Sequence, residues 1–180
     1  MNIETIQVSA CRGAFDRNTY DVNLLQWLES VRPEYPRTEW EKKQLPAIMP
    51  HGLFKTRKQD SFKKHSGLVQ IDIDAKHQRD SWTLETTLEL MAEQKEIIAY
   101  GKSCGGQGAY ALVAVRNINA DKHTDLAEDV ISLATEWLWS DIDMPVSNNL
   151  SSLRFASPYM PVINYDCVPL LMVDTNDKEI

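Results

Sequence analysis

Residues 67–75 read GLVQIDIDA, and this run constrains the fold more than any other part of the chain. Its branched aliphatic side chains suit a half-buried strand, because β-branched residues pack well on a pleated surface. Asp72 and Asp74 interrupt the pattern, although aspartate is depleted in strands. Residues two apart in a strand project from the same face. We therefore predict a strand with two neighbouring carboxylates on one face and buried aliphatic side chains on the other.

The bulk composition is that of one soluble globular domain. The chain has 180 residues, of which 43% are hydrophobic and 25% charged. We expect a single domain over residues 1–172 and a flexible tail at 173–180. The three scattered cysteines, and the lack of a signal-peptide pattern or a long apolar run, favour a cytoplasmic protein without a membrane partner. The net charge of −7 argues against nucleic-acid binding over the whole surface.

The order of predicted elements indicates an α+β fold, because strands and helices alternate without a long linker. A turn is expected at 50–52, and 55–64 reads as a basic loop with five cations and one acid, which is either solvated or a contact for phosphate. We predict strands at 3–10, 67–74, 96–101, 109–115 and near 152–156, and helices that begin at the capping residues Asp21, Thr38, Ser81 and Asp121. A polar loop is expected between the last helix and the last strand.

The aspartate pair suggests a metal site. Two carboxylates held about 7 Å apart along a strand repel each other, and their pKa values rise unless a cation lies between them. Mg²⁺ is the natural candidate, because it prefers one or two carboxylates together with substrate phosphates. The alternative is a strand end that turns into solvent, with polar side chains outward and apolar side chains inward.

Two further segments contain groups that suit a phosphate site. The run KSCGGQGAY at 102–110 is rich in glycine, and backbone N–H groups at Gly105, Gly106 and Gly108 can converge on an anion, with Lys102, Ser103 and Gln107 as side-chain donors. The alternative is a glycine-rich hairpin. The run SDIDMPVSNNLSSLRFASP at 140–158 supplies Asp141 or Asp143 as a further metal ligand and Arg154 as a clamp on phosphate oxygens. Taken singly, each of these residues is better explained as a helix-end acid or a surface arginine.

Four segments in this order resemble the VirE N-terminal domain family. They are KKQLPAIMPHGLFKTR, HSGLVQIDIDA, KSCGGQGAYALVAV and NNLSSLRFASP, and the resemblance spans roughly residues 8–170. That family looks like a branch of the archaeo-eukaryotic primase superfamily, found in replication proteins of mobile elements and phages. The resemblance implies an RRM-like antiparallel sheet with packed helices and an N-terminal α/β unit.

The resemblance also implies a site on the face of the sheet. Asp72, Asp74 and Asp143, or Asp141 in place of the last, would be catalytic ligands of Mg²⁺ or Mn²⁺. The implied nucleotide-binding residues are Lys102, Ser103, Gly105, Gly106, Gly108, Tyr110 and Arg154, and the implied contacts to template or phosphate are Lys43, Lys55, Arg57 and His65. Tyr110 stands where primases usually have a histidine. Ser152 stands where an arginine is common, with Arg154 two residues later.

Three functions follow as hypotheses. The first is a primase-polymerase-like nucleotidyltransferase that uses nucleotide triphosphates and a DNA or RNA template, with a helicase or another replication protein as partner. The second is a module that has lost catalysis and keeps nucleotide or nucleic-acid binding, which the departures at Tyr110 and Ser152 favour. The third is a protein-interaction module, for which Trp139 at a helix end is the residue to test.

Overall fold

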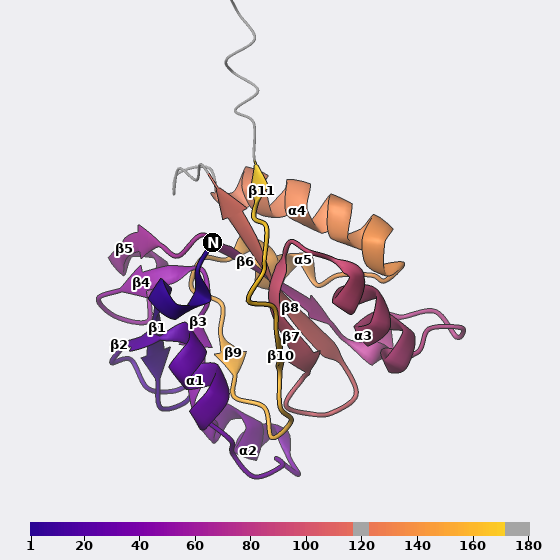
Figure 1. Ribbon diagram of the computed structural model, residues 1–180. Helices are drawn as coiled ribbons and strands as arrows, with labels where there is room; N and C mark the ends of the chain where they lie inside the picture. Colours follow the sequence, from indigo (N-terminus) through magenta and orange to yellow (C-terminus); the bar gives the residue numbers. More distant parts are fainter. Residues whose placement is uncertain (117–122, 172–180) are drawn as a thin grey trace, which may run out of the picture.

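The framework of the protein consists of two mainly antiparallel sheets that lie side by side, with helices packed around them (Figure 1). The computed structural model describes residues 1–116 and 123–171. The predicted α+β class is confirmed. The expected tail at 173–180 and the predicted helix cap at Asp121 lie outside the described residues.

The first sheet is built mainly from the N-terminal part of the chain. Its strand order is β2-β1-β3-β9, and every neighbouring pair is antiparallel. Its strands are β1 (Gln7–Cys11), β2 (Tyr20–Asn23), β3 (Ala47–Met49) and β9 (Arg154–Phe155). The helices that accompany it are η1 (Ile3–Thr5), α1 (Leu24–Ser30) and α2 (Glu39–Gln44). β9 brings a segment from late in the chain into a sheet formed by the first fifty residues.

The second sheet contains the aspartate strand at one edge. β8 pairs with β7 on one side and with β6 on the other, both antiparallel, and with β11 in parallel. The strands are β6 (Leu68–Ile73), β7 (Ile97–Lys102), β8 (Ala109–Arg116), β10 (Val162–Ile163) and β11 (Leu170–Leu171). The predicted strands at 67–74, 96–101 and 109–115 are therefore confirmed within one or two residues.

The strand β6 has two buried faces with different neighbours. Val69, Ile71 and Ile73 belong to a core with residues of α3 (Leu84–Glu93) and α4 (His123–Leu138), which cover this face of the sheet. Leu68, on the opposite face, belongs to the core shared with the first sheet. Because Asp72 projects from the same face as Leu68, its carboxylate points toward the junction of the two sheets.

The segment predicted as a basic loop forms a hairpin instead. β4 (Gly52–Phe54) pairs antiparallel with β5 (Phe62–His65), and the short helix η2 (Gln59–Ser61) lies between them. The polar loop predicted after α4 contains another short helix, α5 (Met144–Asn148), which begins with Asp143 as its cap. Both segments are too short and polar to show a hydrophobic period, and tertiary contacts decide their structure.

Helix caps were predicted with mixed success. Thr38 and Glu41 form the expected capping box of α2. Asp21 was the wrong cap for α1: it lies in β2, and Asn23 accepts the capping bond from Gln26 N–H. Likewise α3 is capped by Thr83 and not by Ser81. In both cases the helix begins two residues later, because another cap-forming side chain follows the predicted one.

The three cysteines all lie in the described part of the chain, where they are buried and free. Among the helices of residues 1–116 and 123–171, none is long and apolar enough to cross a membrane.

Candidate functional site

The two aspartates of the β6 segment share one face of the strand, as predicted. Asp72 is the fifth residue of β6 and lies opposite Tyr110 of β8. Asp74 follows the strand with an extended backbone (φ −99°, ψ 123°), so that the alternation of side chains continues. Both residues are partly exposed, whereas the intervening Ile73 is buried.

The Asp72 carboxylate is held by an arginine from the other sheet. Arg154 of β9 donates from Nη1 to Asp72 Oδ1 at 2.5 Å, and its guanidinium lies 4.7 Å from the centre of the Tyr110 ring. Arg154 is only 5% exposed. Burial acts to lower the pKa of its guanidinium, but the charge and hydrogen bond of Asp72, together with smaller effects of Cys104 and Tyr110, outweigh burial and raise the pKa. This pair joins the two sheets at the predicted site.

The predicted role of Arg154 was a clamp on ligand phosphate. The structure places the side chain inside the protein instead, where Asp72 neutralises it and where its Nε has no hydrogen-bond partner among the described residues. A buried ion pair whose partner is removed leaves an uncompensated charge, which is strongly unfavourable. The role that the structure gives to Arg154 is therefore to connect the two sheets through its ion pair with Asp72.

The other two predicted metal ligands also have protein partners. The Asp74 carboxylate forms an ion pair with Lys76 Nζ at 2.8 Å and accepts from Lys76 N–H, at the start of the helix η3 (Ala75–His77). Partial burial acts to raise the pKa of Asp74, but the bonds to Lys76 outweigh it and lower the pKa. Asp143 accepts from Val146 N–H at 3.4 Å as the cap of α5, and its own N–H donates to Asp72 O at 2.9 Å.

The three carboxylates therefore come from adjoining segments, yet they do not form a metal cage. Within residues 1–116 and 123–171, no group of three His, Cys, Asp or Glu side chains is placed to hold a metal ion. A Mg²⁺ or Mn²⁺ ion between them would compete with Arg154 for the carboxylate of Asp72. Asp141, the alternative third acid, lies farther along: Gln78 bonds its backbone N–H and carbonyl, and it lines a separate cavity described below.

The glycine-rich segment forms a closed turn between β7 and β8. Ser103 N–H donates to Gly108 O, and Gly106 N–H donates to Ser103 O, so one of the amides expected to face a phosphate, that of Gly106, is used within the turn. A Cβ at Gly108 would lie 2.4 Å from Ile73 O, so only glycine allows the turn to approach β6 this closely.

The aromatic neighbours of the turn limit its access further. Gly106 has φ +72° and packs against Tyr159. Tyr35 donates to Gly105 O, and Lys102 Nζ lies 5.8 Å from the Tyr159 ring.

The predicted phosphate contacts separate into two groups. Lys43 and Lys55 are exposed, and Arg57, which is half-buried, donates its N–H to Arg17 O. His65 is different, because both of its ring nitrogens are bonded to protein groups: Nδ1 accepts from Gly67 N–H, and Nε2 lies 3.0 Å from His123 Nδ1. His65 is therefore placed to support the structure.

Three histidines form a network that the sequence did not reveal. The His51 and His123 rings lie 4.5 Å apart, and those of His65 and His123 lie 5.2 Å apart. Because His65 Nδ1 accepts, its proton is on Nε2 and is donated to His123, which in turn donates from Nε2 to Ser147 O. His51 accepts from Gln70 N–H and donates from Nδ1 to Asn149 O.

All three imidazoles are thus neutral, and each of their ring nitrogens takes part in a hydrogen bond. Burial lowers the pKa of His51 to about 3 and that of His65 to about 3, and the neighbouring rings act in the same direction. Burial also lowers the pKa of His123, against the opposing bond to Ser147 O. The residues lie far apart in the sequence, and no spacing signals the contact.

The network also protects the open edge of the second sheet. Gln70 N–H is satisfied by His51, Gln70 O by Ser147 Oγ at 2.6 Å, and Asp72 O by Asp143 N–H. An uncovered edge strand would pair with another chain. The β4–β5 hairpin, α5 and the start of α4 are therefore fixed to β6 by side chains and by one backbone bond.

Comparison with known proteins identifies a family. A family model described as BT4734-like, N-terminal domain, matches residues 40–144, which is more than half of the 180 residues. This is a different family from the VirE N-terminal domain family, so the assignment of the chain to that family, and through it to the primase superfamily, is wrong. No curated protein and no solved structure matches the chain.

Proposed function

The chain belongs to the family of BT4734-like N-terminal domains, and from this premise we propose that it is a binding module for the phosphate backbone of a nucleic acid. The proposal keeps the binding function that the sequence suggested and sets aside metal-dependent synthesis. One observation carries it, namely the separation of charge between the two parts of the chain.

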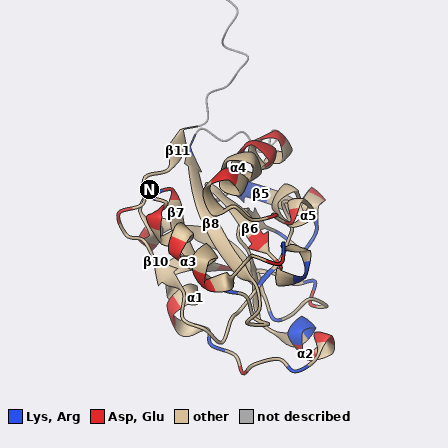
Figure 2. Ribbon diagram, turned by 90° about the vertical axis from the view of Figure 1, so that its right-hand side faces the viewer, with Lys and Arg blue, Asp and Glu red and all other residues tan. Residues whose placement is uncertain are grey.

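The separation is large for a protein of this size. Residues 1–66 contain 11 Lys and Arg against 8 Asp and Glu, whereas the remaining residues contain 8 against 18. Figure 2 shows blue segments at β5 and α2 and red segments on α3 and α4. A protein with a net charge of −7 can therefore attract a polyanion to one side while it repels the polyanion from the other.

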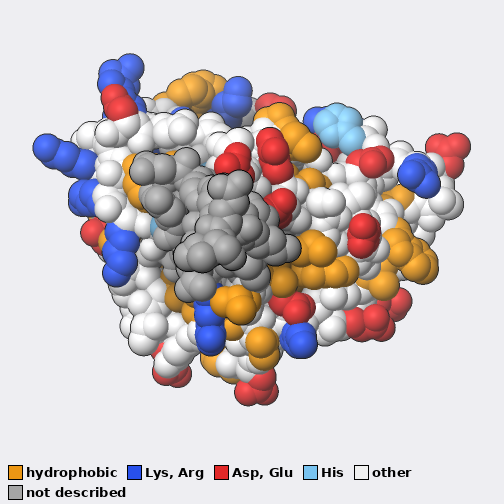
Figure 3. Space-filling view, turned by 90° about the horizontal axis from the view of Figure 1, so that it is seen from above, with side chains coloured by type: hydrophobic (Ala, Val, Ile, Leu, Met, Phe, Trp, Pro, Cys, Tyr) orange, Lys and Arg blue, Asp and Glu red, His pale blue; other side chains and the backbone are white. Residues whose placement is uncertain are grey.

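The cations of the β4–β5 hairpin and its neighbouring loops form what we call the basic surface. Lys63 and Lys64 of β5 are exposed, and Figure 3 shows Lys and Arg side chains along the side of the molecule where the hairpin lies. A bridge between Asn18 and Thr56 ties the loops together. The basic surface consists of Arg12, Arg17, Lys55, Arg57, Lys58, Lys63 and Lys64.

The arrangement of the carboxylates supports binding over synthesis. Phosphoryl transfer by paired metals needs carboxylates that are available to the ions. Asp72 is bonded to a buried arginine, and Asp74 to a lysine. The basic surface needs no such rearrangement, because its lysines are already exposed.

A nucleotidyltransferase remains the second candidate. Asp72 and Asp74 share one face, and Asp143 adjoins them through the bond to Asp72 O. Synthesis would require Mg²⁺ or Mn²⁺ to displace Arg154 and Lys76, and it would use nucleotide triphosphates, a DNA or RNA template and a helicase or other replication partner. All of these stay predictions.

Salt-dependent binding tests the first candidate. Fluorescence anisotropy of a labelled single-stranded oligonucleotide, measured in EDTA over a range of salt, should show affinity that falls steeply as salt rises. Lys63→Ala with Lys64→Ala should weaken binding about tenfold at low salt and reduce the salt slope by about 1.4, since each of the two backbone contacts contributes about 0.7. Lys95→Ala, an exposed lysine outside the basic surface, is the matched control. Equal losses in both variants would contradict the assignment.

Primer extension separates the two candidates. The wild-type protein, a primed template, nucleotides and Mn²⁺ should give no extended product if the domain only binds. Extension that disappears in Asp74→Asn would establish the nucleotidyltransferase and reject the proposal of binding alone. Asp74 is the better variant than Asp72, because its partner Lys76 is exposed and can be solvated when the pair is broken.

A further inference from the structure

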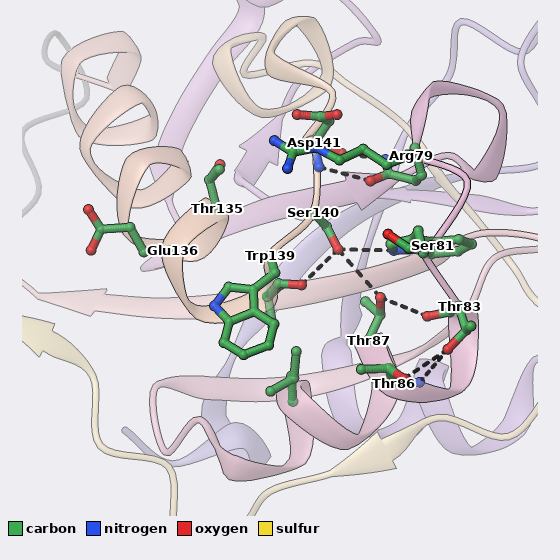
Figure 4. A pocket seen from close by; sticks show the side chains of 14 residues that line it. Arg79, Ser81, Thr83, Thr86, Thr87, Thr135, Glu136, Trp139, Ser140 and Asp141 are labelled. Carbon is green, nitrogen blue, oxygen red and sulfur yellow. Dashed lines mark hydrogen bonds between the residues drawn. The ribbon is translucent and has the colours of Figure 1, made fainter.

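A cavity of about 530 Å³ lies between the beginning of α3 and the end of α4, in the acidic part of the molecule. Figure 4 shows Trp139 on the α4 side of this cavity and Thr83, Thr86 and Thr87 on the α3 side, with Arg79 and Asp141 near one another at its rim. Its volume is in the range of small-molecule sites. We call it the Trp139 cavity.

Trp139 is held in a conformation that folding does not explain. It directly follows α4 with φ 47°, the left-handed region that helices usually fill with glycine. A bulky residue is strained there. Trp139 is also 80% exposed, so burial of its indole contributes little free energy to offset this strain. Strained backbone and exposed aromatic surface are typical of positions kept for binding.

Ser140 in the lining of the cavity is fixed by hydrogen bonds, and the threonines of the lining offer hydroxyl groups. Ser140 Oγ accepts from Trp82 Nε1 at 3.0 Å and donates to Leu138 O at 2.8 Å. Thr83 Oγ1 donates to Thr86 Oγ1 at 2.8 Å, which leaves the Thr86 hydroxyl proton to point elsewhere. The lining of the cavity thus combines an exposed indole with hydroxyl groups that can donate and accept.

Charge decides which ligand suits the cavity. The charged residues that line it are two acids, Glu136 and Asp141, and one cation, Arg79. The neighbouring helix α3 carries three further acids, Glu85, Glu89 and Glu93. A phosphate or carboxylate ligand would be repelled. A neutral ligand with an apolar face and many hydroxyls fits both the indole and the walls. We propose that the Trp139 cavity binds a neutral sugar ring, stacked on the indole and bonded by Glu136 and by the hydroxyls of the exposed Thr83 and Thr86.

This inference is independent of the proposed function, because it concerns another surface and an uncharged ligand. The test is a titration with neutral methyl pyranosides, N-acetylglucosamine, maltose and cellobiose, followed by the five indole N–H signals in ¹H–¹⁵N NMR spectra. At least one sugar should shift the Trp139 signal with a dissociation constant on the order of millimolar. Adenosine monophosphate should not shift it.

Variants distinguish binding from a general effect on the fold. Trp139→Ala should weaken the binding about tenfold, whereas Trp139→Phe keeps an aromatic face and should stay within about threefold. Trp40→Ala removes another exposed tryptophan, which lies in α2 and does not line the cavity, and should therefore change nothing. Trp139→Gly should lose binding with a melting temperature no lower than that of the wild type. No shift with any sugar at 50 mM, or a stronger shift with the nucleotide, would overturn the proposal.

Discussion

Acid should lower the free energy of unfolding of this protein at a pH where its carboxylates are still charged. The reason is that the hydrogen bonds of the histidine network require neutral rings. His51 and His65 each have a nitrogen that must accept a backbone N–H, and a second proton on that nitrogen would remove the bond. In the unfolded chain their pKa returns to about 6.5. The pKa values of His51 and His65 in the folded protein are about 3, so the unfolded state binds more protons between these values. Stability is therefore complete above pH 6.5 and is lost as pH falls toward 3.

The size of the effect follows from the shift. Each histidine changes the free energy of unfolding by about 1.4 kcal/mol per pH unit in this window. The two together remove about 4 kcal/mol between pH 7 and pH 5, a large share of the 5–15 kcal/mol that is usual for a domain. Asp74 has a lowered pKa, so its contribution is lost only below its ordinary value of 3.8.

Urea unfolding at pH 7.5, 6.0 and 5.0 measures this dependence. The amide of His51→Gln can donate and accept but does not titrate, so the variant should lose about half of the pH slope, although it is less stable at pH 7.5. His77→Gln is the control, since His77 is exposed. If His51→Gln and the wild type lose stability in parallel between pH 6.5 and 5, the network is not the cause and the reasoning fails.

Two further predictions concern the candidate site. Asp72→Asn should lower the free energy of unfolding by about 3–5 kcal/mol, because buried Arg154 would lose its counter-charge; Asp74→Asn should cost less than about 1 kcal/mol, as an exposed pair does. Gly108→Ala should destabilise the protein measurably in urea, since its Cβ would lie 2.4 Å from a backbone oxygen of β6, whereas Gly105→Ala meets nothing within 4 Å and should not. If Asp72→Asn leaves the free energy of unfolding unchanged, the Arg154 pair does not hold the two sheets together. If Gly108→Ala leaves it unchanged, the turn and β6 pack less tightly than the 2.4 Å approach implies.

Local patterns were sufficient to predict much of the fold. The alternation in β6, the pair β7 and β8 around the glycine turn, and the capping box of α2 each depend on neighbouring residues. Short segments were missed, because a hairpin such as β4–β5 and a helix of five residues such as α5 are stabilised by distant contacts more than by their own pattern. The caps were assigned two residues early for another reason, namely that two cap-forming side chains stand close together at each helix start.

The candidate site also contains features that the local sequence predicts and others that depend on distant contacts. Asp72 and Asp74 were placed on one face correctly, because that depends only on the two-residue period of a strand. Which cation neutralises Asp72 could not be predicted, since Arg154 lies 82 residues away and reaches β6 only through the pairing of β9 with β3. The basic run at 55–64 was visible in the sequence, whereas its exposure on a hairpin was not.

The sequence by itself determined the class of fold, the aspartate strand and the position of the basic residues, because these depend on composition and on short periods. Only the tertiary structure decided that Arg154 is an internal partner, that three distant histidines form a neutral network, and that Trp139 stands exposed beside a cavity. Such contacts arise when the packing of sheets and helices brings separated segments together, and no local property of the chain specifies which residues will meet.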